Sequence, residues 1–186
     1  SRLISTRSII AGGLLLIAIG SLTLSYVGTD SGTGLLIVGM SLLTLGIGAA
    51  STLNSDIVLT AAAPEKAGAA SALSETGAEL GGAVGIAILG TIGTTVYRNG
   101  VQGALPPGTP PEIAGPASET IGGGIAVADL LPPPLNDALR ELAATSFIDG
   151  LELAALWCAG GMTLSALVVF LLLRNQRLAP HVRENT

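Results

Sequence analysis

Two glutamates, Glu75 and Glu79, interrupt a small and apolar stretch that reads SALSETGAELGGAVGIAILG over residues 71–90. Residues four apart share one face of a helix, about 6 Å from each other along its axis. Two carboxylates this close, and partly withdrawn from water, disfavour each other's charge, so such a pair can take up and release protons. Their charge in apolar surroundings would also attract an organic cation. The spacing therefore predicts a proton-binding or substrate-binding site at Glu75 and Glu79.

The same stretch carries a stripe of glycines, Gly77, Gly81 and Gly85. The stripe is offset from the glutamates by two residues, or about 200°, so it lies on roughly the opposite face of a helix. Glycines four apart let a neighbouring helix approach closely within a membrane. We therefore interpret them as a helix-packing surface, separate from the acidic ridge formed by the two glutamates.

The composition indicates a membrane protein. Of the 186 residues, 49% are hydrophobic and 11% are charged, whereas about 25% are charged in an ordinary soluble domain. The apolar residues form four blocks, at about 8–27, 34–53, 67–97 and 147–173, the last being most apolar from Leu151 onward. Each block is long enough as a helix to cross a hydrocarbon core about 30 Å thick. The predicted fold is an all-α membrane protein with four transmembrane helices.

Depth in the membrane separates the two glutamates. The third block is longer than a bilayer requires. Counting about 20 residues back from Val96 places the inner boundary near Gly77. Glu75 would then lie at the interface, where solvation alone could explain it, whereas Glu79 would lie just inside the hydrocarbon. A carboxylate there is costly unless it is protonated or faces a protein cavity.

The distribution of Lys and Arg predicts the orientation. With the N-terminus inside, six basic residues fall in cytoplasmic segments and two, Arg98 and Arg140, fall outside. Cytoplasmic segments of membrane proteins carry the excess of Lys and Arg. We therefore expect a multi-pass protein of the cytoplasmic membrane with both termini in the cytoplasm. Residues 1–98 would form three spans, and residues 174–186 would form a basic cytoplasmic tail.

Residues 99–146 would then form an extracytoplasmic loop. This segment holds eight of the ten prolines, and its five acidic residues stand against a single basic one, Arg140. This excess of acidic residues excludes a nucleic-acid-binding surface here, because such surfaces are basic. Prolines at this density prevent a continuous helix, although Glu119–Leu130 and Leu135–Ala144 could each form a short one. A compact cap outside the membrane and a disordered loop both fit the sequence.

Other polar residues give weaker predictions. Asn54 and Asp56, at the inner end of the second block, could form part of an inner gate. The single histidine, His181, stands alone in the polar tail, and the single cysteine, Cys158, lies inside the last block. These residues provide neither a metal site nor a nucleophile with its base. We expect no enzyme and no cofactor, with protons as the coupling ion.

The stretch APEKAGAASALSETGAELGGAVGIAILGTIG at 63–93, preceded by NSDIV at 54–58, resembles the next-to-last membrane helix of the fourteen-span drug:proton antiporters of the major facilitator superfamily. The long outer loop, last span and short basic tail that follow are similar as well. The resemblance implies proton-driven export of hydrophobic, often cationic compounds such as quaternary ammonium antiseptics and dyes. It also implies that Glu75 and Glu79 bind substrate or protons, because they match acidic positions four apart in that family.

Motifs of the family's earlier spans are absent from this chain, which begins with Ser1. From this resemblance we expect the chain to be the C-terminal portion of a longer exporter. Its expected partners are membrane lipid, the remaining helices of that exporter, and small hydrophobic or cationic substrates, with no nucleic acid. Alternating access needs two bundles around a central site, so the fragment alone should not transport. Two alternatives stay open: a self-contained four-span assembly or interaction protein without transport activity, and an exporter of a metabolite or lipid from the same superfamily.

Overall fold

The computed structural model describes residues 6–28, 33–105 and 109–174, with side chains over 8–28, 33–52, 62–105 and 109–172. This part of the chain forms helices α1 (Thr6–Leu24), α2 (Thr33–Ala61), the short 3-10 helix η1 (Pro64–Lys66), α3 (Ala67–Ala104), α4 (Pro111–Glu119), α5 (Ile121–Ala128) and α6 (Leu135–Arg174). The described ranges contain no β-strand. The predicted all-α fold is confirmed.

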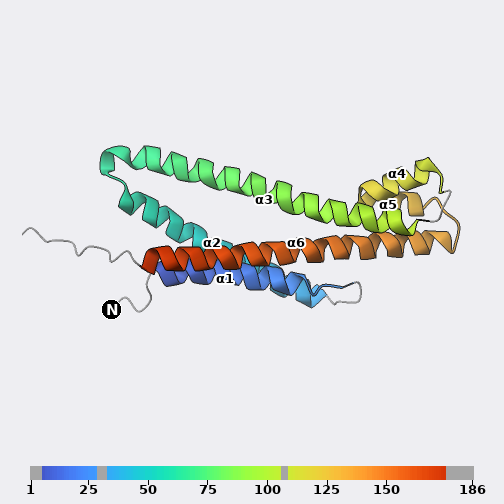
Figure 1. Cartoon of the computed structure of the whole chain (residues 1–186), viewed down its shortest axis with the longest axis horizontal. Coiled ribbons are helices and arrows are strands. Elements are labelled where there is room, and N and C mark those ends of the chain that lie inside the picture. The colour runs from blue at the N-terminus through green and yellow to red at the C-terminus, as the bar shows by residue number, and fades with distance from the viewer. Residues whose placement is uncertain (1–5, 29–32, 106–108, 175–186) are drawn as a thin grey trace, which may run out of the picture.

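The four long helices run alternately in opposite directions and form an elongated bundle (Figure 1). One end of the bundle, here called the terminal end, holds the start of α1, the start of α3 and the end of α6. The opposite end holds α4 and α5 and is called the cap end. The helix ends next to the predicted cytoplasmic segments therefore lie at one end, and the described part of the predicted outer loop lies at the other.

Glycines set the distance between α1 and α2. A Cβ atom added at Gly46 would lie 2.6 Å from the carbonyl oxygen of Gly13, and one added at Gly20 would lie 2.9 Å from that of Gly39. No side chain fits at these distances, so the two backbones are in direct contact. Glycines seven residues apart on each helix thus allow two antiparallel helices to approach closely at two successive points.

Small residues also accompany the packing of α1 against α6. The two helices bury alanines, Ala18 on α1 and Ala155 and Ala159 on α6 among them. The Ser21 hydroxyl of α1 donates a hydrogen bond of 3.3 Å to the Cys158 sulfur of α6. Cys158 therefore serves helix packing, which is a common role for a free cysteine in an apolar interior.

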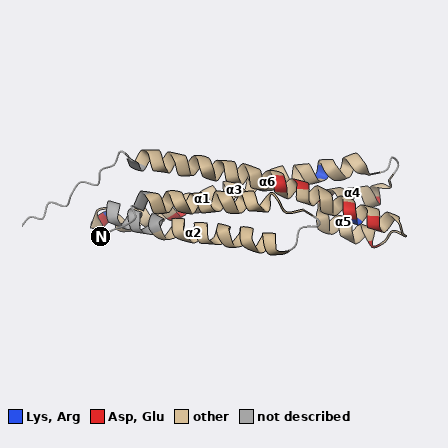
Figure 2. Cartoon of the chain, turned by 90° about the horizontal axis from the view of Figure 1, so that it is seen from below, with Lys and Arg blue, Asp and Glu red and all other residues tan. Residues whose placement is uncertain are grey.

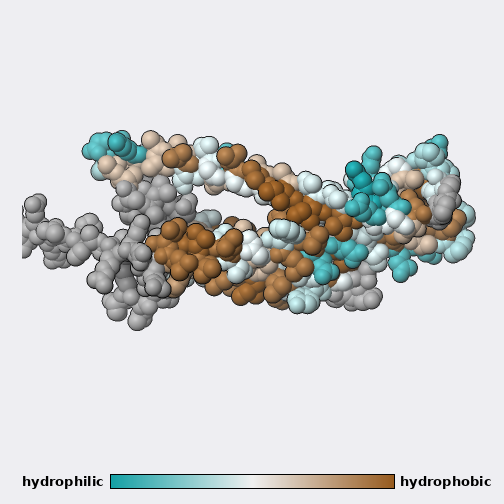
Figure 3. Space-filling view, viewed as in Figure 1, coloured by the Kyte–Doolittle hydropathy of each residue, from teal (hydrophilic) through white to brown (hydrophobic). Residues whose placement is uncertain are grey.

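Three of the described helical segments are long and apolar enough to cross a membrane, namely Thr33–Thr52, Pro64–Ala104 and Leu135–Leu172. The apolar part of α1, Ser8–Leu24, is shorter. The whole of α1 has 19 residues and is about 28 Å long. All four predicted blocks are helical, and much of their surface is exposed and hydrophobic (Figure 3). Such a surface suits contact with lipid or with further helices.

The described part of the predicted outer loop is mostly helical, so a disordered loop is the wrong interpretation. α3 continues to Ala104, past the predicted boundary at 98, and α6 begins at Leu135 and not near 147. The prolines agree with this arrangement because several stand at helix starts. Pro111 is the first residue of α4, and Pro132–Pro134 precede α6. At such positions a proline removes no N–H that the helix needs.

The cap has a hydrophobic core of its own. Tyr97 and Val101 of α3 pack with buried residues of α4, α5 and α6, namely Ala117, Val127, Ala128, Leu139 and Ala143. On its surface, Arg140 of α6 forms an ion pair with Asp129, the residue after α5. Acidic side chains gather at this end of the bundle (Figure 2). The cap therefore joins α3 to α6 at the end where the two helices meet.

Candidate substrate and proton site

Glu75 and Glu79 lie in the half of α3 nearest the terminal end, and both are exposed. Because α3 is unbroken from Ala67 to Ala104, the two carboxylates share one face of the helix as their spacing predicts. Neither forms an ion pair with any residue that the structure describes. The acidic ridge is therefore accessible to solvent, to a substrate or to further helices.

This half of α3 stands apart from the other described helices. Cβ atoms added at Gly77, Gly81 and Gly85 would meet no described atom within 4 Å. Figure 3 shows open space between this part of α3 and the helices opposite. At the cap end the helices do meet, since a Cβ added at Gly150 would lie 2.6 Å from the carbonyl oxygen of Gly93. The packing role of the glycine stripe thus stays a prediction.

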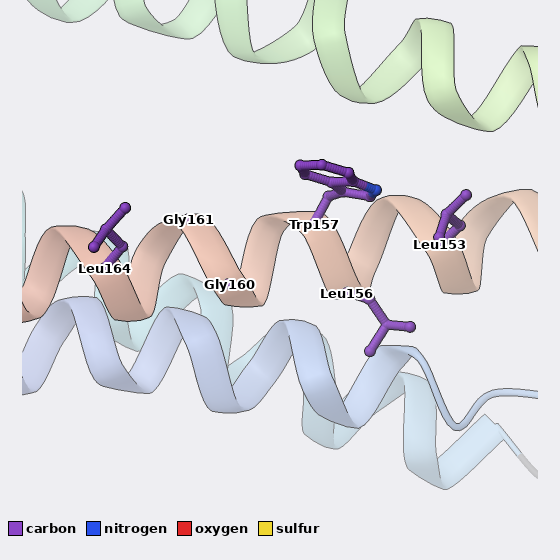
Figure 4. Close-up of a pocket in the computed structure, with 6 residues that line it drawn as sticks. All are labelled: Leu153, Leu156, Trp157, Gly160, Gly161 and Leu164. Carbon is purple, nitrogen blue, oxygen red and sulfur yellow. The ribbon is translucent and has the colours of Figure 1, made fainter.

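α6 supplies an apolar wall to the opening. A hollow of about 420 Å³ on α6 is lined by Leu153, Leu156, Trp157, Gly160, Gly161 and Leu164. Trp157 lies on the side of α6 that faces α3, and its side chain is 62% exposed, whereas Leu156 points toward α1 (Figure 4). An indole whose face is open can attract an organic cation as well as pack against its apolar parts.

The antiparallel register brings the Leu164 end of this wall level with Glu79. Gly93 of α3 lies against Gly150 of α6. Glu79 is fourteen residues before Gly93, and Leu164 is fourteen residues after Gly150. Both positions therefore lie at about the same height along the bundle. The opening combines two carboxylates on one side with an apolar, partly aromatic surface on the other.

Two predicted site residues cannot be placed in this way. Asn54 and Asp56 belong to the last part of α2, where the side chains lie outside the described residues. Their role in an inner gate stays a prediction. Over the ranges that the structure describes, no group of three or more His, Cys, Asp or Glu residues could hold a metal ion. The arrangement around Glu75 and Glu79 is suited to binding a cation or a proton.

Sequence reasoning did not single out Trp157 or the close contact of α1 with α2. Trp157 is the only tryptophan in the chain and precedes the pair Gly160 and Gly161 by three residues, so the small neighbours leave room beside its ring. The α1–α2 contact was detectable in the seven-residue spacing of its glycines. The four-residue glycine spacing at Gly77, Gly81 and Gly85 does not predict this contact.

Similar proteins are named for drug efflux, export or resistance. The multidrug efflux pump LfrA of Mycolicibacterium smegmatis is 38% identical over 157 residues, which are 84% of this chain and 31% of LfrA. The tetracenomycin C resistance and export protein of Streptomyces glaucescens is 30% identical over 167 residues, 87% of this chain and 31% of that protein. The methyl viologen resistance protein SmvA of Salmonella typhimurium is 33% identical over 160 residues, 82% of this chain and 32% of SmvA.

The chain belongs to the major facilitator family of multidrug efflux proteins. This agrees with the resemblance seen at residues 63–93. The chain spans slightly less than a third of the length of these relatives, 31% in the case of LfrA. No family model and no solved structure matches it. Membership in this family and the apolar helices make it a membrane protein.

Proposed function

We propose that this chain forms part of a proton-coupled multidrug exporter, with Glu75 and Glu79 on the transport pathway. The observation that carries the proposal is the acidic ridge on the exposed half of α3, in a chain whose relatives are named for drug efflux and resistance. Those names favour an exporter over a four-span assembly protein. The expected substrates are hydrophobic compounds, often cationic.

In this proposal, Glu75 and Glu79 couple the export of substrate to the entry of protons. A carboxylate that binds a proton loses the negative charge that attracts another cation, and acidic residues in transporters often lie on proton and substrate pathways. Substrate and proton would then compete for Glu75 and Glu79, so that binding one releases the other. Competition of this kind is sufficient to link outward movement of the substrate to inward movement of protons.

The wall of α6 provides the affinity for the apolar part of a substrate. Trp157 and Leu164 are each 62% exposed, and they lie across the opening from α3. Burying such side chains against a ligand contributes about 25 cal/mol for each Å² of apolar surface removed from water. A broad apolar wall with few fixed hydrogen-bonding groups accepts ligands of different shapes. Such tolerance is a requirement of multidrug export.

The charge distribution along the chain predicts which end of the bundle faces the cytoplasm. In the sequence, six of the eight basic residues fall in the segments predicted to be cytoplasmic, whereas acidic side chains gather at the cap end (Figure 2). By the positive-inside rule the terminal end faces the cytoplasm. Glu75 and Glu79, in the half of α3 nearest that end, would then be loaded with substrate from the cytoplasmic side of the cell membrane.

The experiment is dye efflux from cells that express the complete natural protein carrying these residues. Glu79→Gln keeps the size of the side chain and removes its charge, so ethidium efflux should fall to background. The matched control is Glu65→Gln, because Glu65 is an exposed carboxylate in η1, away from the acidic ridge. Wild-type efflux by Glu79→Gln at equal protein levels, over a range of external pH, would refute the proposal.

A further inference from the structure

A second cavity lies at the cap end, away from Glu75 and Glu79. It has a volume of about 330 Å³ and lies between α3, α6 and the turn that joins α4 to α5. Its walls include Gly90 and Tyr97 of α3 and Phe147 and Leu151 of α6, with Glu119 and Thr120 at the turn. The cap core holds together the helices that form its walls, and the lining includes one acidic residue, Glu119.

The lining has an unusual composition for this chain. The whole sequence contains five aromatic residues, one Trp, two Tyr and two Phe, and two of the five line this cavity. Tyr97 is held in place by its hydrogen bond to Ala117. Phe147, in contrast, is 45% exposed. Aromatic rings that line an apolar cavity are a frequent feature of sites for organic cations.

Glu119 is the charged residue among those that line the cavity. It is the last residue of α4, and Thr120, which follows it, caps α5 by accepting a hydrogen bond from the backbone N–H of Gly123. The only basic residue of segment 99–146, Arg140, is paired with Asp129. Glu119 has no ion pair among the residues that the structure describes. Glu119 thus lies next to a capped turn, and no described basic side chain pairs with its carboxylate.

We propose that this cavity is a second binding site, for hydrophobic monocations that carry aryl groups. The aryl groups would lie against Tyr97, Phe147 and Leu151, and the positive charge would lie near Glu119. A neutral lipid chain could contact the same apolar walls, but it would gain nothing from the negative charge of Glu119. The charge therefore favours a cation. This inference does not rest on the transport role of Glu75 and Glu79, from which the cavity is separated along α3.

The test is direct binding to the complete natural protein in lipid nanodiscs. The probe is tetraphenylphosphonium, and tetraphenylborate serves as a control of the same shape and opposite charge. Binding is measured by equilibrium dialysis in a Glu75→Gln/Glu79→Gln background, which removes any contribution from the acidic ridge. Empty nanodiscs correct for partition into lipid.

Two matched pairs of variants decide the outcome. Glu119→Gln should weaken tetraphenylphosphonium binding by about threefold or more, the range expected for a partly exposed charge pair, and should not weaken tetraphenylborate binding. Glu112→Gln, at the start of the same helix, should leave both unchanged. Gly90→Leu should weaken both probes because it fills the cavity from a position with open space beside it, whereas Gly103→Leu, also open, should not.

The proposal is overturned if no saturable tetraphenylphosphonium binding remains in the double-Gln background. It is also overturned if Glu119→Gln and Glu112→Gln bind the probe equally well. Its failure is distinguishable from failure of the proposed function. Loss of efflux in Glu79→Gln with unchanged binding in Glu119→Gln would refute only the second site, and the reverse pattern would refute only the transport role of the acidic ridge.

Discussion

The Tyr97 hydroxyl donates a hydrogen bond of 2.8 Å to the carbonyl oxygen of Ala117, and this bond joins α3 to α4 in the middle of the cap. Both residues are buried, with Tyr97 4% exposed and Ala117 0% exposed. A buried carbonyl oxygen that loses its donor costs about 1–3 kcal/mol. The bond therefore stabilises the docking of the cap on the end of α3.

Tyr97→Phe is expected to lower the stability of the cap by about 1–3 kcal/mol, because the ring is kept and the Ala117 carbonyl loses its donor. Amide hydrogen exchange in α4 and α5 should become faster, while α1 and α2 keep their protection. Thr95→Val is the matched control, since it removes an exposed hydroxyl two residues away. Unchanged exchange in α4 and α5 would show that the cap does not depend on this bond.

Gly46→Ala is expected to destabilise the bundle by about 1–3 kcal/mol, the usual cost of forcing extra atoms into a packed interior. The new Cβ would lie 2.6 Å from the carbonyl oxygen of Gly13, whereas at Gly48 it would meet nothing within 4 Å. Gly48→Ala should therefore leave the melting temperature unchanged or slightly raised. Equal melting temperatures for the two variants would mean that α1 and α2 are not in backbone contact at Gly46.

Gly81→Leu tests the glycine stripe. Within the described chain its Cβ would meet nothing, so any penalty must come from helices that pack on α3 in the complete protein. We expect a lower yield of folded protein for Gly81→Leu, because a large side chain blocks close helix approach. Gly82→Leu, one residue around the helix, should cost less. Normal yields for both variants, measured by fluorescence-detected size exclusion, would remove the packing role of the stripe.

The positions of the long helices follow from the sequence because long apolar blocks have few alternatives in a membrane. The block at 34–53 became Thr33–Ala61, and the block at 67–97 became Ala67–Ala104. The ends of these helices could not be predicted as well from the sequence. α3 and α6 continue outward because the cap core buries Val101 and Leu139, and that burial depends on contacts between residues far apart in the sequence.

The acidic ridge could also be predicted from the sequence, because two carboxylates four residues apart lie on the same face of a helix. The cap-end cavity was not, because Glu119, Phe147 and Tyr97 come together only when α4 and α5 dock on α3 and α6. The same holds for the wall at Trp157. The position of the Leu164 end of this wall opposite Glu79 depends on the antiparallel register fixed where Gly93 meets Gly150.

The most direct test of the central claim is proton movement during transport by the complete protein in proteoliposomes that contain a pH-sensitive dye. An imposed ethidium gradient should drive protons in the opposite direction, with wild-type protein and Glu65→Gln alike. Glu79→Gln should abolish this proton flux, because it removes the group for which substrate and proton compete. Ethidium transport without any proton flux, or an undiminished flux in Glu79→Gln, would contradict the account.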